Sequence, residues 1–136
     1  MANETEKLTI NLGIVELAQV DVLVEQGIYS NRSDFIRTAI RKQLENHGDR
    51  IERALTPIPT ATQKDWLRAI GIFTISKEEL EEFVKNNEKI NISVIGMLIL
   101  ERDISVELFK RAVNKIVIRG KLVASDELKE IVKKES

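Results

Sequence analysis

The sequence predicts an α+β protein whose two halves are built on different plans. Residues 7–12 alternate polar and apolar side chains, which is the period of a half-buried strand, and two helices with apolar faces follow. In the second half, Gly71, Gly96 and Gly120 recur at spacings of 25 and 24 residues, each leading to apolar residues and a serine that suits a helix start. We therefore expect a strand–helix–helix unit, then a small α/β domain of about three strand–turn–helix repeats.

Composition places the chain among globular proteins and excludes several kinds of site. Its 136 residues are 43% hydrophobic and 32% charged, and the absence of cysteine excludes disulfides, Cys-ligated zinc and Cys nucleophiles. The N-terminus lacks the basic start and apolar core of a signal peptide. No apolar run approaches the roughly 20 residues that span a bilayer. We expect a cytoplasmic protein with no membrane partner.

The expected strand over residues 7–12 has one apolar and one polar face. The apolar face consists of Leu8, Ile10 and Leu12. The polar face consists of Lys7, Thr9 and Asn11. A two-stranded ribbon can enter the major groove of DNA, where Asn pairs with adenine, Lys donates to guanine and Thr contacts thymine. Taken alone, however, the pattern favours an ordinary solvated strand face.

The first helix is expected over residues 14–26, with Gly27 as the residue beyond its C-terminus. Its apolar surface is wider than one small domain can hide, which suggests burial between subunits. Glu16, Asp21 and Glu25 make its outer side acidic, and we expect that side to face away from DNA.

The second helix has a clear start. Asn31 is the expected N-cap, and Asp34 stands three residues later, as a shorter version of the capping-box acid. The exposed N–H groups at this start form an anion site that suits a DNA phosphate, and Arg32 and Ser33 add side-chain donors. From the capping residues alone, an ordinary capped helix is the simpler interpretation.

About a third of the chain resembles the ribbon-helix-helix family of the Arc/MetJ type. The resemblance covers residues 7–47 and rests on the strand polarity and on the segment GIYSNRSDFIR at residues 27–37. It implies an intertwined homodimer, in which two strands form an antiparallel ribbon that docks in the major groove of double-stranded DNA. It also implies base reading by Lys7, Thr9 and Asn11. The phosphate-binding residues that it implies are Ser30, Asn31, Arg32 and Ser33. The dimer core that it implies consists of Leu8, Ile10, Leu12, Leu17, Val20, Leu23, Val24, Phe35, Ile36, Ala39, Ile40 and Leu44.

The charge balance argues against nucleic acid. Residues 1–53 carry 7 Lys/Arg against 9 Asp/Glu, a net of −2, and residues 54–136 carry 14 against 13, a net of +1. Because a DNA-binding domain usually has a basic footprint, positive charge must be concentrated on one face.

The predicted domains are residues 1–48 for DNA binding and dimerisation, a partly helical linker over 49–63, and the α/β domain over 64–136. Pro57 and Pro59 mark the linker. The glycine-centred segments of the last domain predict a short parallel sheet of about three strands backed by short helices, like part of a solenoid. Their expected helix caps are Ser76, Ser105 and Ser125. Because small sheets leave open edges, we expect this domain to serve a higher oligomer or a protein partner.

The leading functional hypothesis is a dimeric, sequence-specific transcriptional regulator that acts as a repressor. One alternative is the antitoxin of a toxin–antitoxin pair, and another is an interaction scaffold that has lost DNA binding. An enzyme is the least favoured class, because no nucleophile is paired with a base. The chain has a single histidine, His47, and no Gly-rich phosphate loop, so we expect no metal and no cofactor.

Overall fold

A computed structural model describes residues 5–55 and 66–135 of the chain. The chain divides into two compact units, Met1–Gly48 and Asp49–Ser136, and each is described by itself. The proline-containing part of the predicted linker lies outside the described residues. Within the described ranges, no helix is long and apolar enough to cross a membrane.

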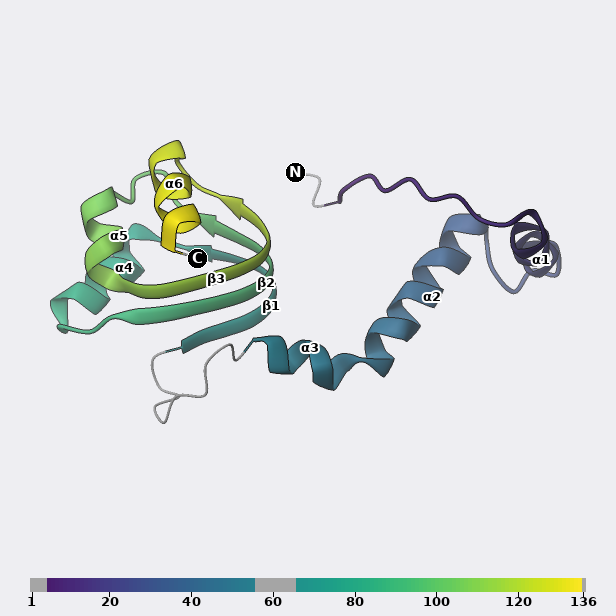
Figure 1. Ribbon diagram of the computed structural model, residues 1–136, viewed down its shortest axis with the longest axis horizontal. Helices are drawn as coiled ribbons and strands as arrows, with labels where there is room; N and C mark the ends of the chain where they lie inside the picture. The colour runs from purple at the N-terminus through teal and green to yellow at the C-terminus, as the bar shows by residue number, and fades with distance from the viewer. Residues whose placement is uncertain (1–4, 56–65, 136) are drawn as a thin grey trace. The chain divides into compact units, whose positions relative to one another are not determined.

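The first unit consists of an extended segment and two helices, α1 (Ile14–Glu25) and α2 (Arg32–Asn46), as Figure 1 shows. Both helices were predicted. A short helix, α3 (Gly48–Ala54), begins where this unit ends. The strand predicted over residues 7–12 is not formed in the single chain, where residues 5–13 have no regular structure. A strand needs hydrogen bonds from a neighbouring strand, and residues 5–55 provide none.

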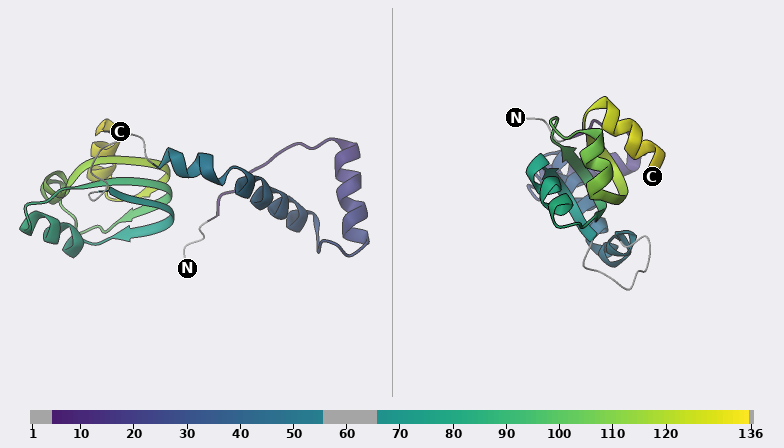
Figure 2. Two further views of the ribbon diagram at one scale, coloured as in Figure 1. Left: turned by 90° about the horizontal axis from the view of Figure 1, so that it is seen from below. Right: turned by 90° about the vertical axis from the view of Figure 1, so that its left-hand side faces the viewer.

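The second unit contains the predicted three-stranded parallel sheet, with strand order β1-β2-β3. Its strands are β1 (Trp66–Ile75), β2 (Ile90–Leu100) and β3 (Val113–Val123). Its helices are α4 (Lys77–Lys85), α5 (Val106–Ala112) and α6 (Asp126–Glu135). One helix follows each strand and returns the chain, so that the next strand runs in the same direction (Figures 1 and 2).

Serine side chains cap all three of these helices, as the sequence predicted. Ser76, Ser105 and Ser125 each accept a hydrogen bond from the backbone N–H three residues later, at 3.2, 3.1 and 3.3 Å. At α4 the cap is reciprocal, because the Glu79 carboxylate accepts from the Ser76 N–H at 2.8 Å. These bonds fix where each strand ends and its helix begins.

The three glycines lie side by side across the sheet, because Gly71 pairs with Gly96 and Gly96 with Gly120. Their φ angles are 136°, 134° and 132°, in a region that side-chain-bearing residues rarely adopt. A Cβ added at Gly96 would overlap the carbonyl oxygen of Gly71, and one at Gly120 would overlap that of Gly96. Glycine at these two positions therefore lets the curved strands approach each other midway (Figure 1).

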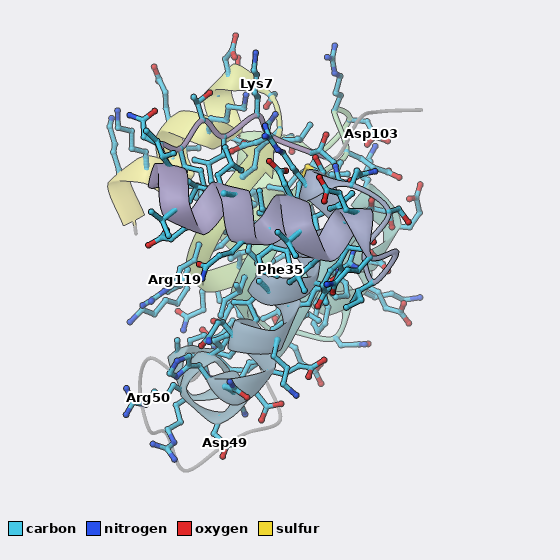
Figure 3. The ribbon with its side chains drawn as sticks, turned by 90° about the vertical axis from the view of Figure 1, so that its right-hand side faces the viewer. Lys7, Phe35, Asp49, Arg50, Asp103 and Arg119 are labelled. Atoms are coloured by element: carbon cyan, nitrogen blue, oxygen red, sulfur yellow. The ribbon has the colours of Figure 1, made fainter. Side chains whose placement is uncertain are left out.

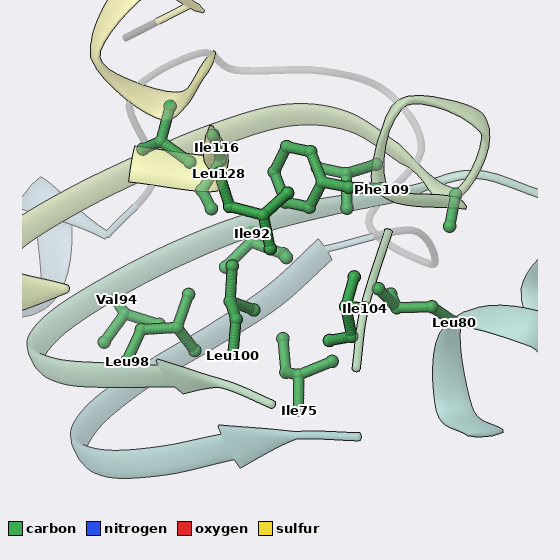
Figure 4. Packing of buried hydrophobic residues seen from close by; sticks show 13 residues of the cluster. Ile75, Leu80, Ile92, Val94, Leu98, Leu100, Ile104, Phe109, Ile116 and Leu128 are labelled. Carbon is green, nitrogen blue, oxygen red and sulfur yellow. The ribbon is translucent and has the colours of Figure 1, made fainter. Parts of the chain in front are cut away.

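The hydrophobic core of this unit lies between one face of the sheet and the three helices. From β2, Ile92, Val94, Leu98 and Leu100 enter this core, since alternate residues share a face. The helices contribute Leu80 from α4, Phe109 from α5 and Leu128 from α6, each at most 1% exposed (Figure 4). The core is thus completed within one chain.

Candidate nucleic-acid interface

The residues predicted to read bases lie on the extended segment before α1. Lys7, Thr9 and Asn11 are exposed there, and Figure 3 shows Lys7 projecting from the segment. The apolar residues between them are also uncovered: Leu8 is 78% exposed, Ile10 53% and Leu12 40%. Three large apolar side chains in alternate positions are therefore largely or partly exposed in the single chain.

A tight reversal joins the two helices. Gly27 has a φ of 77°, as expected of a residue that ends a helix in the left-handed conformation. Its N–H donates to the Val24 carbonyl at 3.0 Å, and the Ile28 N–H donates to the Leu23 carbonyl at 3.1 Å. This pair of bonds is the Schellman motif, and it fixes the direction in which the chain leaves α1.

Hydrogen bonds between side chains and backbone fix the start of α2. The Asn31 side chain accepts from the Asp34 N–H at 2.8 Å, which confirms the predicted N-cap. The Asp34 carboxylate accepts from the Ser30 N–H at 3.0 Å, one residue earlier than in a capping box. The N–H groups of Arg32 and Ser33 precede Asp34 in the first turn, where no helical carbonyl can accept from them. These two N–H groups remain available for an anion.

Arg32 forms a two-pronged ion pair with Asp21 of α1. Its Nε lies 2.8 Å from Oδ1 and its Nη2 lies 2.8 Å from Oδ2. The hydrogen bond from Arg32 is the main reason that the pKa of Asp21 lies below its ordinary value. Asp21 also holds the pKa of Arg32 above its ordinary value. Both side chains stay accessible, at 56% for Arg32 and 40% for Asp21.

This ion pair involves Asp21, which the sequence analysis expects on a side that faces away from DNA. Its carboxylate is beside a predicted phosphate-binding residue and offsets the positive charge there. No local sequence pattern marks the pair, because 11 positions separate the two residues and the turn between them sets their distance. Arg32 uses only part of its five N–H donors on Asp21, so other donors remain for a further anion.

An aromatic contact closes the turn. The rings of Tyr29 and Phe35 meet edge to face, with centroids 5.1 Å apart and an interplanar angle of 86°. Such a pair contributes about 0.5–1.5 kcal/mol beyond the area that it buries. Figure 3 marks Phe35, which places the aromatic contact on α2.

The positions predicted for the dimer core are not gathered into a closed core by one chain. Only Val20 is buried. The half-buried positions are Leu17, Leu23, Val24, Phe35 and Ile36. The exposed positions are Leu8, Ile10, Leu12, Ala39, Ile40 and Leu44. The two helices therefore cover some of their apolar residues and leave the others at the surface.

Comparison with known proteins assigns the chain to a family. The model of the Ribbon-Helix-Helix transcriptional regulator family matches residues 3–129, which is most of the chain and includes residues of both units. The chain belongs to this family. It is also similar to the transcriptional regulator CdrS of Halobacterium salinarum, with 33% identity over 45 residues, 33% of this chain and 82% of that protein. No solved structure matches it.

Family membership makes the protein a DNA-binding transcriptional regulator. It extends the resemblance that the sequence showed over residues 7–47, because the match continues through the parallel sheet. Among the described residues, no group of three or more His, Cys, Asp or Glu side chains is arranged to hold a metal ion.

Proposed function

We propose that the chain is a homodimeric repressor that reads the major groove with a ribbon made of residues 7–12 from two copies. The observation that carries this proposal is the alternation of exposed residues in that segment. Leu8, Ile10 and Leu12 are 78%, 53% and 40% exposed in one chain, and pairing with a second copy would cover them. The intervening residues Lys7, Thr9 and Asn11 would then face the bases.

The second copy would also complete the helical core. Ile40 and Leu44 of α2 are 49% and 53% exposed, although they lie on the same helix stripe as half-buried Ile36. An apolar stripe that continues past the cover provided by its own chain is typical of a subunit interface. We therefore assign residues 7–47 to dimerisation as well as to DNA binding.

The start of α2 is the proposed phosphate-binding site. Its backbone N–H groups and its dipole favour an anion, and Ser30, Asn31, Arg32 and Ser33 surround it. Asp21 lowers the net charge of this site by pairing with Arg32. We therefore propose that the backbone N–H groups carry the main phosphate contact and that Arg32 contributes a reduced electrostatic part.

A titration with DNA tests the proposal. Fluorescence anisotropy would measure the affinity of the full chain for the DNA upstream of its own gene, and for random duplex DNA, at two salt concentrations. A repressor of this kind is expected to bind its operator tightly and to outcompete random DNA. Binding should weaken as salt rises, because phosphate contacts release counterions. If neither DNA binds even at low salt, the proposed function is wrong.

Replacing Asn11 separates base reading from general DNA binding. The substitution Asn11→Ala should weaken operator binding by about 1–3 kcal/mol and leave binding to random DNA largely unchanged. Asn46→Ala is the matched control, since Asn46 is also exposed but lies at the far end of α2. Equal losses of affinity for the operator and for random DNA would show that Asn11 does not read bases.

One other function has specific support, and the experiments also test a second alternative. The net charge of −2 over residues 1–53 and the neutralised Arg32 favour a scaffold that has lost DNA binding. Failure of all DNA at low salt, together with a stable dimer, would establish it. The same N-terminal fold also serves antitoxins, and a small toxin that co-purifies with the chain would establish that function instead. The packed sheet unit argues against the simple tail that antitoxins usually carry.

A further inference from the structure

The two edges of the parallel sheet carry different side chains in the same rows. On one face of the β3 edge the alternate positions are Lys115, Val117, Arg119 and Lys121, so three of the four are cations. In register with them on the β1 edge are Trp66, Arg68, Ile70 and Ile72, so three of the four are apolar. Cations on an edge strand discourage pairing with another strand, and apolar residues permit it. By this criterion the side chains of β3 discourage pairing with another strand, whereas those of β1 permit it.

Apolar surface lies on both faces of the β1 edge. On one face, Ile70 is 52% exposed and Ile72 is 44% exposed. On the other, a mainly apolar cavity of about 290 Å³ lies between β1 and α4, with Leu67, Phe73 and Phe83 among its lining residues. An incoming strand that paired with β1 would find apolar side chains above and below it.

The sequence of β1 is self-complementary about its central glycine. If two copies of β1 pair in antiparallel register with Gly71 opposite Gly71, Ile70 of each stands opposite Ile72 of the other. Leu67 then stands opposite Ile75, and Ala69 opposite Phe73, on the core side of the sheet. The only charged residue of β1, Arg68, stands opposite Thr74, so no like charges meet.

We infer that β1 pairs with β1 of a second copy of this chain, joining two three-stranded sheets into one of six strands. This contact is isologous and closes after two copies. The other arrangement, β1 against β3 of the next copy, places Ile70 and Ile72 beside Arg119 and Lys121. It also leaves an open edge at each end and adds copies without limit.

The inference goes beyond the proposed function and rests on it in one respect. An N-terminal dimer would hold two sheet units on one assembly, which raises their effective concentration for each other. The β1 contact would then be a second, separate interface of the same dimer.

Paired cysteines test the contact in the full chain, which has none of its own. The double variant Ile70→Cys/Ile72→Cys places a thiol on each side of Gly71, so that each faces its counterpart across the proposed interface. The matched control is Arg119→Cys/Lys121→Cys, in the same two rows on the other edge. Mild oxidation should convert most of the β1 variant to a covalent dimer that reductant reverses, and leave the β3 variant monomeric under denaturing electrophoresis.

Hydrogen exchange of the unmodified chain provides a second readout that no substitution can disturb. Backbone N–H groups along β1 should exchange slowly if the edge is paired. The inference is overturned if the β3 variant crosslinks as well as the β1 variant, or if the β1 variant stays monomeric while the β1 edge exchanges freely. DNA titration of the reduced β1 variant separates the two proposals. If the chain binds DNA but the β1 variant does not crosslink, only this inference is wrong. If the β1 variant crosslinks but the chain does not bind DNA, only the proposed function is wrong.

Discussion

The two units of the chain differ in how completely each buries its own apolar residues. The sheet unit has a core cluster of thirteen buried residues, whereas among residues 5–48, the described part of the first unit, Val20 is the only buried hydrophobic residue. Of the twelve exposed large hydrophobic residues in the described ranges, nine lie in the first unit, from Leu8 to Leu44. In one chain, therefore, the sheet unit buries a hydrophobic core and the first unit leaves most of its apolar residues exposed or half-buried.

The difference follows from connectivity. In the sheet unit each strand is followed by a helix that returns over one face of the sheet, so the chain supplies both sides of its own core. In the first unit an extended segment precedes two helices, and the described residues of the unit provide neither a strand to pair with that segment nor a third layer. The physical consequence is that the sheet unit buries a core of its own, while the first unit leaves most of its apolar residues exposed or half-buried, as the proposed dimer requires.

The largest effect is expected from a substitution in the glycine row of the sheet unit, where neighbouring strands approach closely. Gly96→Ala places a methyl group against the Gly71 carbonyl and forces alanine into a φ of 134°. Strain and overpacking together should cost on the order of 3–5 kcal/mol in the free energy of unfolding of the sheet unit. Urea unfolding followed by Trp66 fluorescence would measure this loss.

The control for this substitution is Gly48→Ala, since no atom lies within 4 Å of the added Cβ at Gly48. That variant should unfold like the unmodified chain. If Gly96→Ala also leaves the sheet unit unchanged, the close approach of the strands at the glycine row is wrong.

The next largest effect tests whether a second copy covers the exposed apolar residues of the first unit. Ile10 is 53% exposed, so Ile10→Ala should cost almost nothing if one chain is the functional state. If a second copy covers Ile10, the loss of a buried side chain should cost about 2–4 kcal/mol per chain. Thermal unfolding at several protein concentrations would measure it. Thr9→Ala is the neighbouring control and should leave the midpoint unchanged.

A smaller effect is expected at the ion pair that links α1 to the start of α2. Asp21→Asn removes a negative charge beside Arg32, so binding to any duplex should tighten and the salt dependence should steepen by about one counterion per chain. Arg32→Ala should do the opposite. If Asp21→Asn instead weakens binding to all DNA, Asp21 acts by positioning Arg32 rather than by offsetting its charge.

The smallest effect is a dependence on pH. Because Arg32 lowers the pKa of Asp21 in the folded protein, the carboxylate stabilises the fold above the ordinary Asp value of 3.8 and loses this effect as the pH falls through the lowered pKa. The unmodified chain should therefore lose its small advantage over Asp21→Asn between pH 7 and strong acid. Parallel urea unfolding at both pH values would detect it. A constant difference would show that the pair does not stabilise the unit.

The helices, caps and parallel sheet could be predicted because each depends on neighbours in the sequence. Gly27, Asn31 and the serines Ser76, Ser105 and Ser125 act on backbone groups within a few residues, so their chemistry is readable from spacing alone. The parallel direction of the strands followed from the same logic, since short helices between strands lead to parallel neighbours.

Features that depend on contacts between distant residues were not predictable in the same way. The pairing of Arg32 with Asp21 depends on the angle between two helices. The sequence marked the three glycines, but not their backbone angles or the carbonyl oxygens that exclude a side chain. Residues 7–12 have no strand to pair with in residues 5–55, so the predicted strand does not form in the single chain, and base reading by its polar residues is a proposal.

Backbone hydrogen exchange of residues 8–12 of this chain is the most direct test of the proposal that this segment pairs with a second copy. An antiparallel ribbon made with a second copy should protect the N–H groups that point toward the partner strand, leave the others exchanging freely, and lose this protection as dilution separates the copies. Uniformly fast exchange across the segment, at a concentration where sedimentation shows two chains together, would contradict the account.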